Sequence, residues 1–400
     1  MAFFRRVIIP GSGSDLLREE LDLAFSSLGL PVSRLLPRAL REPRDALLPL
    51  LEDGPALLFS VNFSGLERMG EALELLQGHG GQAAVWCVDN PWNLLAGVRD
   101  ARWKTLPFFV TDASFLPALQ GHGAERAVHL PLAASPAHFL PHPRRGAVFP
   151  PPADLAPFVF VGRSAFPGKE KFFAGRSLPE DLRQEAVRLL SGGGRPDFAW
   201  WEERLAALEE PLGGRAVFWP GKKARRPALG AEECSLAWRA LCLEAAAGRG
   251  DGPGLDIFGD AGWQGLLPPT ARLRPPVDYY ARLPGIYAAA RFSLSLTSLQ
   301  LPSGLNQRHF DVWMAGGVCL TDASPGLALF PRDLVRPVRF SSPEDIRRAA
   351  RRAEDYPGGR EALIADWRGV ILEKHTYRHR AEQVLEILSP ARPRKTTKRP

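Results

Sequence analysis

Short, nearly continuous apolar runs recur along the chain and are separated by longer polar or amphipathic stretches. Runs of this kind are typical of strands in a parallel sheet that helices cover on both faces. In the first half they are Val7–Pro10, Ala56–Val61, Ala83–Val88, Leu106–Thr111 and Ala127–Leu130. In the second half they are Phe158–Val161, Leu255–Phe258, Phe292–Leu296, Val318–Thr321 and Val338–Phe340.

Helical periodicity fills several of the intervening stretches. The predicted helices cover about 15–28, 180–190, 201–210, 231–247, 343–353, 360–373 and 375–388. Between the halves, Pro136–Pro157 is dense in proline and indicates a stiff connector. The pattern therefore predicts an α/β fold of two Rossmann-like, doubly wound domains, at 1–150 and 151–388, followed by a disordered basic tail at 389–400.

The stretch Leu301–Asp322 predicts a loop, a short helix, a glycine stop at Gly316–Gly317 and a buried strand. With the preceding strand Arg291–Thr297 it forms a right-handed crossover unit of a parallel sheet. Its strand-to-helix loop contains the polar run 306–309 (Asn-Gln-Arg-His). Such loops open at the sheet edge where α/β proteins bind ligands.

Polar residues also follow three of the predicted strands in the first half. Asn62 comes after one strand, Asp89 and Asn90 after the next, and Asp112 after a third. Because the carboxyl ends of parallel strands meet at one edge, we expect these side chains to line the same face of the domain.

Composition narrows the class of protein. Four hundred residues with 45% apolar and 24% charged residues suit a globular chain of about two domains. No apolar run is long enough for a transmembrane segment, and the start of the chain does not resemble a secretion signal, so we expect a cytoplasmic protein. The four cysteines are scattered, which argues against a zinc site or a disulfide framework, and we expect Cys87 and Cys319 to be core residues.

The net charge of +7 includes the basic end RPRKTTKRP. A basic excess favours anionic partners, and the end of the chain is compatible with peripheral membrane contact. No nucleic-acid-binding module is recognisable, so no nucleic-acid partner is expected and the tail is interpreted as solubilising.

Eight segments, in order along most of the chain, resemble a known family. The N-terminal ones are FSVNFSG, WCVDNPW, FFVTD and HLPLA, and the C-terminal ones are FVGR, DIFGDAGW, GLNQRHFDVWMAGGVCLTD and EKHTYRHRAEQVL. The C-terminal set resembles the glycosyltransferases of the spore-maturation-protein-like (CgeB-like) family. These belong to the GT-B class, in which two Rossmann-like domains face each other across a cleft. The N-terminal set resembles the domain often fused ahead of it.

The resemblance implies a hexosyltransferase-type enzyme with a nucleotide diphosphate sugar in the C-terminal domain as co-substrate and no other cofactor. The acceptor, a glycan, protein or small molecule, would bind the N-terminal domain, and the terminal helix would cross back toward that domain. Many retaining GT-B enzymes carry two glutamates eight positions apart in the donor loop. Here these positions are Ser303 and Asp311, and Asp311 can still accept hydrogen bonds from ribose hydroxyls.

Glycosyl transfer requires that the departing diphosphate be neutralised, which GT-B enzymes commonly do with basic side chains and helix N-termini instead of a metal. Arg308, at the predicted helix start, is the first candidate, with a surface salt bridge as the alternative. Gly304 and Asn306 share its loop, and turn formation explains Asn306 equally well. Gly162 and Arg163 form a second phosphate-facing candidate. No metal site is expected.

An inverting reaction needs a general base to deprotonate the acceptor hydroxyl. Asp89 is the best-placed carboxylate, although it is also an ordinary turn-former before Asn90 and Pro91. Asp112 and His129 are the next candidates, and Asn62, Asn90 and Asp112 are expected to line the acceptor side of the cleft.

Three other hypotheses remain open at this point. One is a sugar-nucleotide epimerase or hydrolase on the same fold, which would act on nucleotide sugar without an acceptor. Another is a non-catalytic module that binds a sugar or a partner protein, and Ser303 in place of a glutamate favours it. Nucleic-acid binding is the last and depends on net charge alone.

Overall fold

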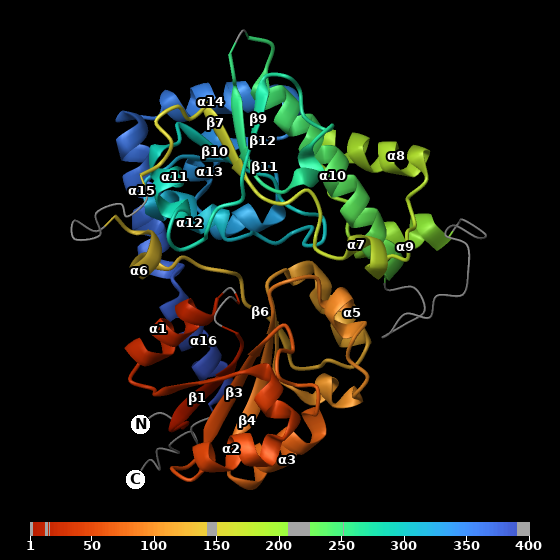
Figure 1. Cartoon of the computed structure of the whole chain (residues 1–400), viewed down its shortest axis with the longest axis vertical. Helices are drawn as coiled ribbons and strands as arrows, with labels where there is room; N and C mark the ends of the chain where they lie inside the picture. Colours follow the sequence, from red (N-terminus) through yellow and green to blue (C-terminus); the bar gives the residue numbers. More distant parts are fainter. Residues whose placement is uncertain are drawn as a thin grey trace, which may run out of the picture. The chain divides into compact units, whose positions relative to one another are not determined.

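The structure of the chain is a computed structural model that describes residues 3–12, 15, 17–141, 150–206, 225–250 and 252–389. Its two sheets are both parallel and six-stranded, and helices surround each of them (Figure 1). This confirms the predicted α/β fold class of two Rossmann-like domains.

The first sheet has the strand order β2-β1-β3-β4-β5-β6. Its strands are β1 (Arg6–Pro10), β2 (Val32–Leu35), β3 (Ala56–Val61), β4 (Gln82–Cys87), β5 (Phe108–Val110) and β6 (Ala127–His129). The α-helices of this part are α1 (Arg18–Ser27), α2 (Pro43–Leu51), α3 (Met69–Gly78), α4 (Pro91–Leu95), α5 (Leu116–Gly121) and α6 (Pro136–Phe139). Short 3-10 helices are η1 (Pro37–Arg41), η2 (Ala101–Thr105) and η3 (Ala113–Phe115).

The second sheet has the strand order β12-β11-β10-β7-β8-β9. Its strands are β7 (Phe158–Val161), β8 (Leu255–Phe258), β9 (Ala271–Arg274), β10 (Phe292–Ser295), β11 (Cys319–Asp322) and β12 (Arg339–Phe340). The α-helices are α7 (Lys169–Phe172), α8 (Glu180–Ser191), α9 (Phe198–Ala206), α10 (Arg225–Ala247), α11 (Leu283–Ala289), α12 (Arg308–Ala315), α13 (Arg332–Val338), α14 (Ile346–Glu354), α15 (Gly359–Lys374) and α16 (Tyr377–Leu388). The 3-10 helices are η4 (Ala261–Trp263), η5 (Pro325–Leu329) and η6 (Pro343–Asp345).

Backbone contacts divide the chain into two compact units, Met1–Val85 with Tyr377–Pro400, and Trp86–Thr376. In the first unit the last helix, α16, lies beside α1, as Figure 1 shows in blue and red. The expected return of the terminal helix toward the N-terminal part is therefore confirmed. The domain limits at 150 and 388 stay predictions, and the basic tail lies outside the described residues from position 390 onward.

The central strands match their predicted limits closely because their sequences are apolar throughout. β3, ALLFSV, is buried at five consecutive positions, and β8 and β10 are buried along their whole length. The prediction missed β2 and β9, whose residues VSRL and ARLR are mostly only half-buried. These strands lie at sheet edges, where a strand needs less apolar surface. All four cysteines are buried and free, and Cys87 and Cys319 are core residues as predicted.

Ion pairs join the edge strand β9 to its neighbour β8. Asp256 in β8 is fully buried and accepts hydrogen bonds from the Ala156 backbone N–H at 2.8 Å and from Arg272 Nε at 2.8 Å. Burial alone would raise the pKa of the Asp256 carboxyl, but the hydrogen bonds from Arg272 and Arg274 outweigh burial and hold that pKa below its ordinary value.

We predict that Asp256→Asn lowers the free energy of unfolding at neutral pH by about 3 kcal/mol, because two arginines lose their buried counter-charge. A carboxyl with a lowered pKa stabilises the protein above its unfolded-state pKa, and this contribution is lost as the pH falls through the folded-state value. The difference from the wild-type protein should therefore shrink below about pH 4. Urea unfolding of the wild-type protein and Asp256→Asn, at neutral pH and below about pH 4, tests this prediction.

The matched control is Asp154→Asn, since Asp154 pairs with the same two arginines but is exposed. An equal loss of stability in both variants would contradict the role given to Asp256.

Candidate functional site

The strand order of the second sheet defines one point at which its winding reverses. The chain runs from β7 outward through β8 to β9, then returns to β10 on the other side of β7. In open α/β sheets, ligands bind beside the carboxyl ends of the strands at such a switch point. The relevant loops are therefore 162–164 after β7 and 296–307 after β10.

Arg308 lies at this switch point. It is the first residue of α12, and its Nη1 donates a hydrogen bond of 2.7 Å to the carbonyl of Val161 at the end of β7. Its guanidinium carbon lies 5.5 Å from the centroid of the Phe160 ring. The Nε of Arg308 is buried and has no hydrogen-bond partner among the described residues. The Arg308 guanidinium is thus fixed at the carboxyl ends of β7 and β10, and its Nε–H has no acceptor among the described residues.

Asn306 fixes the backbone that presents Arg308. Its Oδ1 accepts a hydrogen bond of 3.0 Å from the Arg308 backbone N–H and one of 3.2 Å from the Ser295 hydroxyl. Asn306 therefore forms an Asx turn just before α12, whose N-cap residue is Gln307, and ties the helix start to β10. At the other end, Gly316 has the left-handed φ of 95° that closes the helix, as the sequence predicted.

Gly162 keeps the Arg308 guanidinium uncovered. A Cβ at position 162 would lie 3.0 Å from the Phe160 ring and 3.6 Å from Arg308 Nη1. The next residue, Arg163, is exposed, and its carbonyl accepts a hydrogen bond of 2.9 Å from Nη1 of Arg239 on α10. Burial lowers the pKa of the Arg239 guanidinium, so an anion placed nearby would be stabilised by a poorly hydrated cation.

Asp311 lies one turn into α12 and is buried. The hydroxyl of Tyr279, from the loop after β9, donates a hydrogen bond of 2.5 Å to Asp311 Oδ2. Tyr279 packs edge-to-face on Phe139 at 5.1 Å between ring centroids. The carboxylate is thus held in one orientation by an aromatic side chain from another loop.

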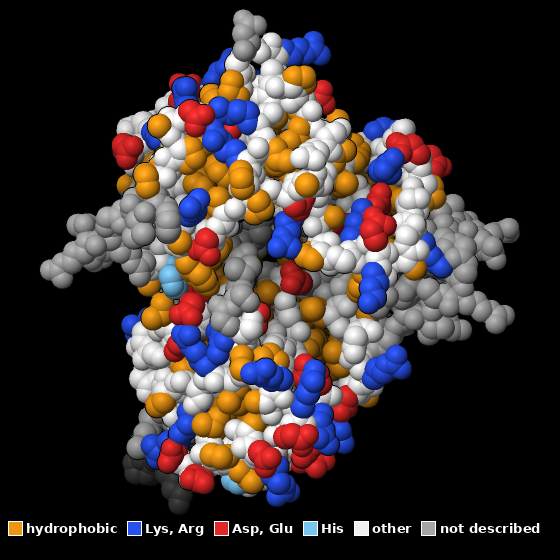
Figure 2. Space-filling view, in the orientation of Figure 1, with side chains coloured by type: hydrophobic (Ala, Val, Ile, Leu, Met, Phe, Trp, Pro, Cys, Tyr) orange, Lys and Arg blue, Asp and Glu red, His pale blue; other side chains and the backbone are white. Residues whose placement is uncertain are grey.

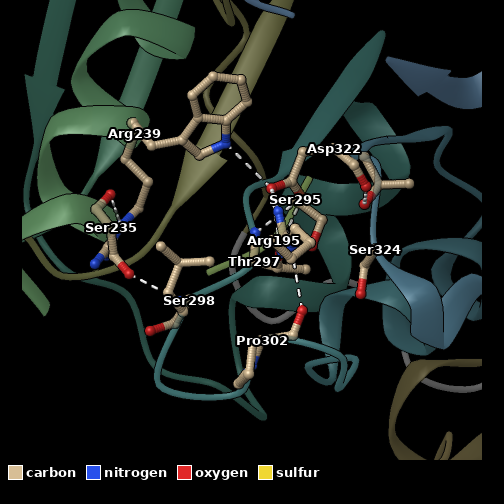
Figure 3. Close-up of polar contacts among 12 residues, drawn as sticks. Arg195, Ser235, Arg239, Ser295, Thr297, Ser298, Pro302, Asp322 and Ser324 are labelled. Carbon is tan, nitrogen blue, oxygen red and sulfur yellow. Dashed lines mark hydrogen bonds and ion pairs between the residues drawn. The ribbon is translucent and has the colours of Figure 1, made fainter. Parts of the chain in front are cut away.

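A buried ion pair holds the loop between β10 and α12 (Figure 3). Arg195 Nη1 lies 2.8 Å from Oδ2 of Asp322, and the Arg195 side chain is 7% exposed against 1% for Asp322. The same guanidinium donates to the Pro302 carbonyl at 3.1 Å and to the Thr297 hydroxyl. Asp322 also accepts the Thr297 backbone N–H at 3.0 Å and the indole N–H of Trp238 at 3.2 Å. Both ends of the segment Thr297–Pro302 are therefore anchored to one pair of charges.

Asp112 holds the next part of the loop. Its Oδ2 accepts hydrogen bonds from the backbone N–H groups of Ser303 at 2.7 Å and Gly304 at 2.8 Å. Its Oδ1 accepts from the N–H and hydroxyl of Ser114, at 2.8 Å and 2.7 Å. Gly304 permits this approach, since a Cβ there would lie 3.2 Å from the Asp112 Cβ. The structure therefore brings Asp112 to the loop between β10 and α12, with both carboxylate oxygens accepting hydrogen bonds.

Asn90 reaches the same loop through Gln300. Asn90 caps α4 by accepting from the Trp92 N–H, and its Nδ2 donates to Gln300 Oε1 at 3.0 Å, as Asn93 does at 3.2 Å. Gln300 in turn donates to the Ala228 carbonyl at 2.9 Å and to Glu232 at 3.2 Å. The remaining predicted residues lie elsewhere at strand ends.

Asp89 is exposed just beyond β4. A ring nitrogen of His129 lies 3.2 Å from the Thr111 carbonyl. Asn62 follows β3 in the other compact unit with a left-handed φ of 53°.

Residues 239–386 match the glycosyl transferase-like family. The matched segment begins within α10 and includes Asp311 and Arg308. The chain thus combines a two-domain Rossmann-like α/β fold with a segment that matches the glycosyl transferase-like family. None of the curated proteins matches the chain in sequence.

Three solved structures illustrate what this chain is similar to. HepE of Anabaena, in complex with UDP-glucose, is 10% identical over 96% of this chain and 99% of its own, with a TM-score of 0.47. A trehalose-phosphate synthase of Burkholderia xenovorans is 13% identical over 88% and 77%, with a TM-score of 0.45. An O-GlcNAc transferase mutant of Thermobaculum terrenum is 12% identical over 96% and 68%, with a TM-score of 0.44.

Among the described residues, no group of three or more His, Cys, Asp or Glu side chains could hold a metal ion. Metal independence stays a prediction. Among the described helices, none combines the length and the apolar character needed to cross a bilayer. On the described part of the face in Figure 2, basic and acidic side chains are interspersed.

Sequence reasoning missed Arg195, Gln300 and Tyr279. Arg195 follows a run of three glycines, and Tyr279 lies in a polar loop after an edge strand, so neither carries a local signal. Gln300 was detectable, because it belongs to the strand-to-helix loop already singled out.

His309 is buried in α12, and its Nε2 lies 2.8 Å from the hydroxyl of Thr321 in β11. Burial lowers the pKa of His309 from 6.5 to about 4. Between these values the unfolded chain binds a proton that the folded chain does not, so stability falls as the pH drops from 6.5 toward 4. We predict a loss of about 3 kcal/mol from this residue over that range.

His309→Gln should remove this part of the pH dependence, measured as urea unfolding at a series of pH values. The exposed His79→Gln is the matched control and should leave the slope unchanged. Equal slopes in the wild-type protein and His309→Gln would rule out a neutral, buried His309.

Proposed function

We propose that this protein is a metal-independent GT-B glycosyltransferase that moves a sugar from a nucleotide diphosphate sugar to an acceptor. The observation that carries the proposal is Arg308, fixed at the switch point of a glycosyl transferase-like domain with its Nε uncommitted. An arginine fork suits phosphate oxygens, and the start of an α-helix adds backbone donors. The donor is a co-substrate, and no further cofactor is needed.

In this proposal the departing diphosphate lies against Arg308 and the loop of Gly162 and Arg163. The missing side chain at Gly162 lets the phosphate approach the strand end, and Arg239 adds positive charge from behind that loop. These cations stabilise the negative charge that builds on the leaving group as the glycosidic bond breaks.

Asp311 accepts hydrogen bonds from the donor ribose. Its burial and the hydrogen bond from Tyr279 support this role, because an oriented carboxylate loses little entropy when it meets two vicinal hydroxyls. Membership of the spore-maturation-protein-like family is part of the same proposal.

The sugar of the donor lies by the loop at Gly304 and Asn306. Asp112 and Asn90 act on this site through the loop, since Asp112 holds the Ser303 and Gly304 backbone and Asn90 holds Gln300. Asp89 is the proposed general base on the acceptor side, with Asn62 as an acceptor contact. An exposed carboxylate at a strand end supports the role of Asp89.

A non-catalytic sugar-binding module is the second candidate. Ser303, at the position where many retaining enzymes have a glutamate, favours it. This candidate shares the donor site with the first but lacks turnover.

We predict that one nucleotide class among UDP, GDP, dTDP and CMP, or its sugars, raises the Tm of the purified chain. A ligand at 100 times its Kd adds about 2.7 kcal/mol to the stability of the folded state. Arg308→Ala should abolish the shift and Arg308→Lys should keep part of it, because lysine retains the charge but not the fork.

The exposed Arg336→Ala is the matched control and should respond like the wild-type protein. A nucleotide shift that persists in Arg308→Ala would refute the assigned site, and the absence of any shift in folded protein would refute donor binding.

We predict that Asp89→Asn lowers transfer by about 10²- to 10⁴-fold, the usual contribution of a general base, while the nucleotide-dependent Tm shift stays intact. Nucleotide release from the donor, measured with a panel of glycan, protein and small-molecule acceptors, reports the rate. Glu125→Gln, another exposed carboxylate near a strand end, serves as control. Unchanged transfer by Asp89→Asn would remove Asp89 from the mechanism, and acceptor-independent release by the wild-type protein would identify a hydrolase.

A further inference from the structure

The first sheet has a switch point of its own, within the first compact unit. The chain passes from β1 to β2 on one side, then returns to β3 on the other side of β1. The strands are in register, with Val7 opposite Leu57 and Ile8 opposite Leu58. Gly11 and Asn62 therefore follow neighbouring strands at the same carboxyl edge, which is the ligand edge of such sheets.

Arg18, the first residue of α1, is buried at this edge without a counter-charge. Its side chain is only 9% exposed, and among the described residues it forms no hydrogen bond or ion pair. Its Nε is one of the buried polar atoms without a partner. A largely buried arginine whose Nε has no hydrogen-bond partner among the described residues is unusual in a folded protein, so its presence needs an explanation.

Three other arginines of the chain have carboxylate partners. Arg6 pairs with Asp53 at 2.5 Å, Arg195 pairs with Asp322 at 2.8 Å, and Arg34 pairs with Glu19 at 2.7 Å. Arg18 differs from them in lacking any described acceptor, and its place at a switch point is where an external acceptor would enter.

The end of β1 lies close to Arg18. A Cβ at Gly11 would lie 3.4 Å from the Cδ of Arg18 and 3.2 Å from Oδ2 of Asp15. Leu17, the residue before α1, has a left-handed φ of 70°, and no side chain caps the helix. The backbone donors of the first turn of α1 therefore lie next to the arginine.

The nearby carboxylates are engaged elsewhere. Asp15 accepts hydrogen bonds from the backbone N–H of Ser12 at 2.6 Å and its hydroxyl at 2.8 Å. Glu19 forms its ion pair with Arg34, and Glu20 is buried with partners of its own. None of the three forms an ion pair with Arg18 in the described part of the chain.

We propose that Arg18 and the first turn of α1 bind an oxyanion, a phosphoryl or carboxylate group, at the switch point between β1 and β3. Arginine presents its donors in a fork that matches either group, and the helix start supplies a favourable dipole. That this group belongs to the acceptor rests on the proposed function. It would make the acceptor an acidic or phosphorylated molecule, with Asn62 at the same edge as a further contact.

The test is thermal unfolding of the full chain, with inorganic phosphate or acetate added against chloride at constant ionic strength. One anion should raise the Tm of the wild-type protein. Arg18→Met should lose that shift and, because it removes an unpaired buried charge, should raise the Tm of the anion-free protein. A purely structural arginine would show the opposite, a lower Tm in Arg18→Met with the anion response unchanged.

Arg34→Gln is the matched control, because Arg34 forms an ion pair with Glu19 of the same helix, α1. It should keep the anion response and should not raise the Tm. Arg18→Lys, which retains the charge, should keep a weaker response, and it replaces Arg18→Met if that variant does not fold. The two anions distinguish a phosphoryl from a carboxylate ligand.

Repeating the titration in Arg308→Ala separates this site from the donor site. The anion shift should persist there, and the nucleotide shift should persist in Arg18→Met. An Arg18-dependent anion shift in a protein that binds no nucleotide would support the anion site and refute the proposed function. No shift of the wild-type protein with either anion, or a full shift in Arg18→Met, would overturn the proposal.

Discussion

The buried ion pair of Arg195 and Asp322 is the interaction on which the conformation of the loop between β10 and α12 depends. Removing two charges from water is costly, and the cost is offset only where the remaining hydrogen-bonding groups are also satisfied. Here the same two side chains engage Thr297, Pro302 and Trp238, so the charges and the loop backbone satisfy each other. A loop held in this way can present a ligand site without a regular element along it.

Several polar side chains of the site form hydrogen bonds within the protein instead of facing solvent. Asp112 accepts two loop N–H groups, Asn306 accepts the backbone N–H of Arg308, and Gln300 links two amide side chains to α10. Arg308, in the described part of this site, keeps a buried Nε without a hydrogen-bond partner. The backbone around it is held in place by these side chains, and a charged group held in this way needs little reorganisation when it meets a ligand.

The sequence predicted the central strands, both sheets and the position of Arg308, because continuous apolar runs and a glycine stop are local signals. It did not predict β2 or β9, since edge strands such as VSRL and ARLR bury too little apolar surface to stand out. Arg195 and Arg18 were also missed. Their significance depends on a partner 127 residues away in one case and on the lack of one in the other, and neither is visible in a linear pattern.

The packing of α16 on α1 has a consequence for biosynthesis. The apolar face of α16, with Ala381, Val384 and Leu388, is synthesised after α1. Residues 28–376 leave the ribosome between them. At about 5–20 residues per second, α1 waits roughly 17–70 s for its partner. Translation therefore sets the order of assembly, and the first unit to be synthesised is the last to be completed.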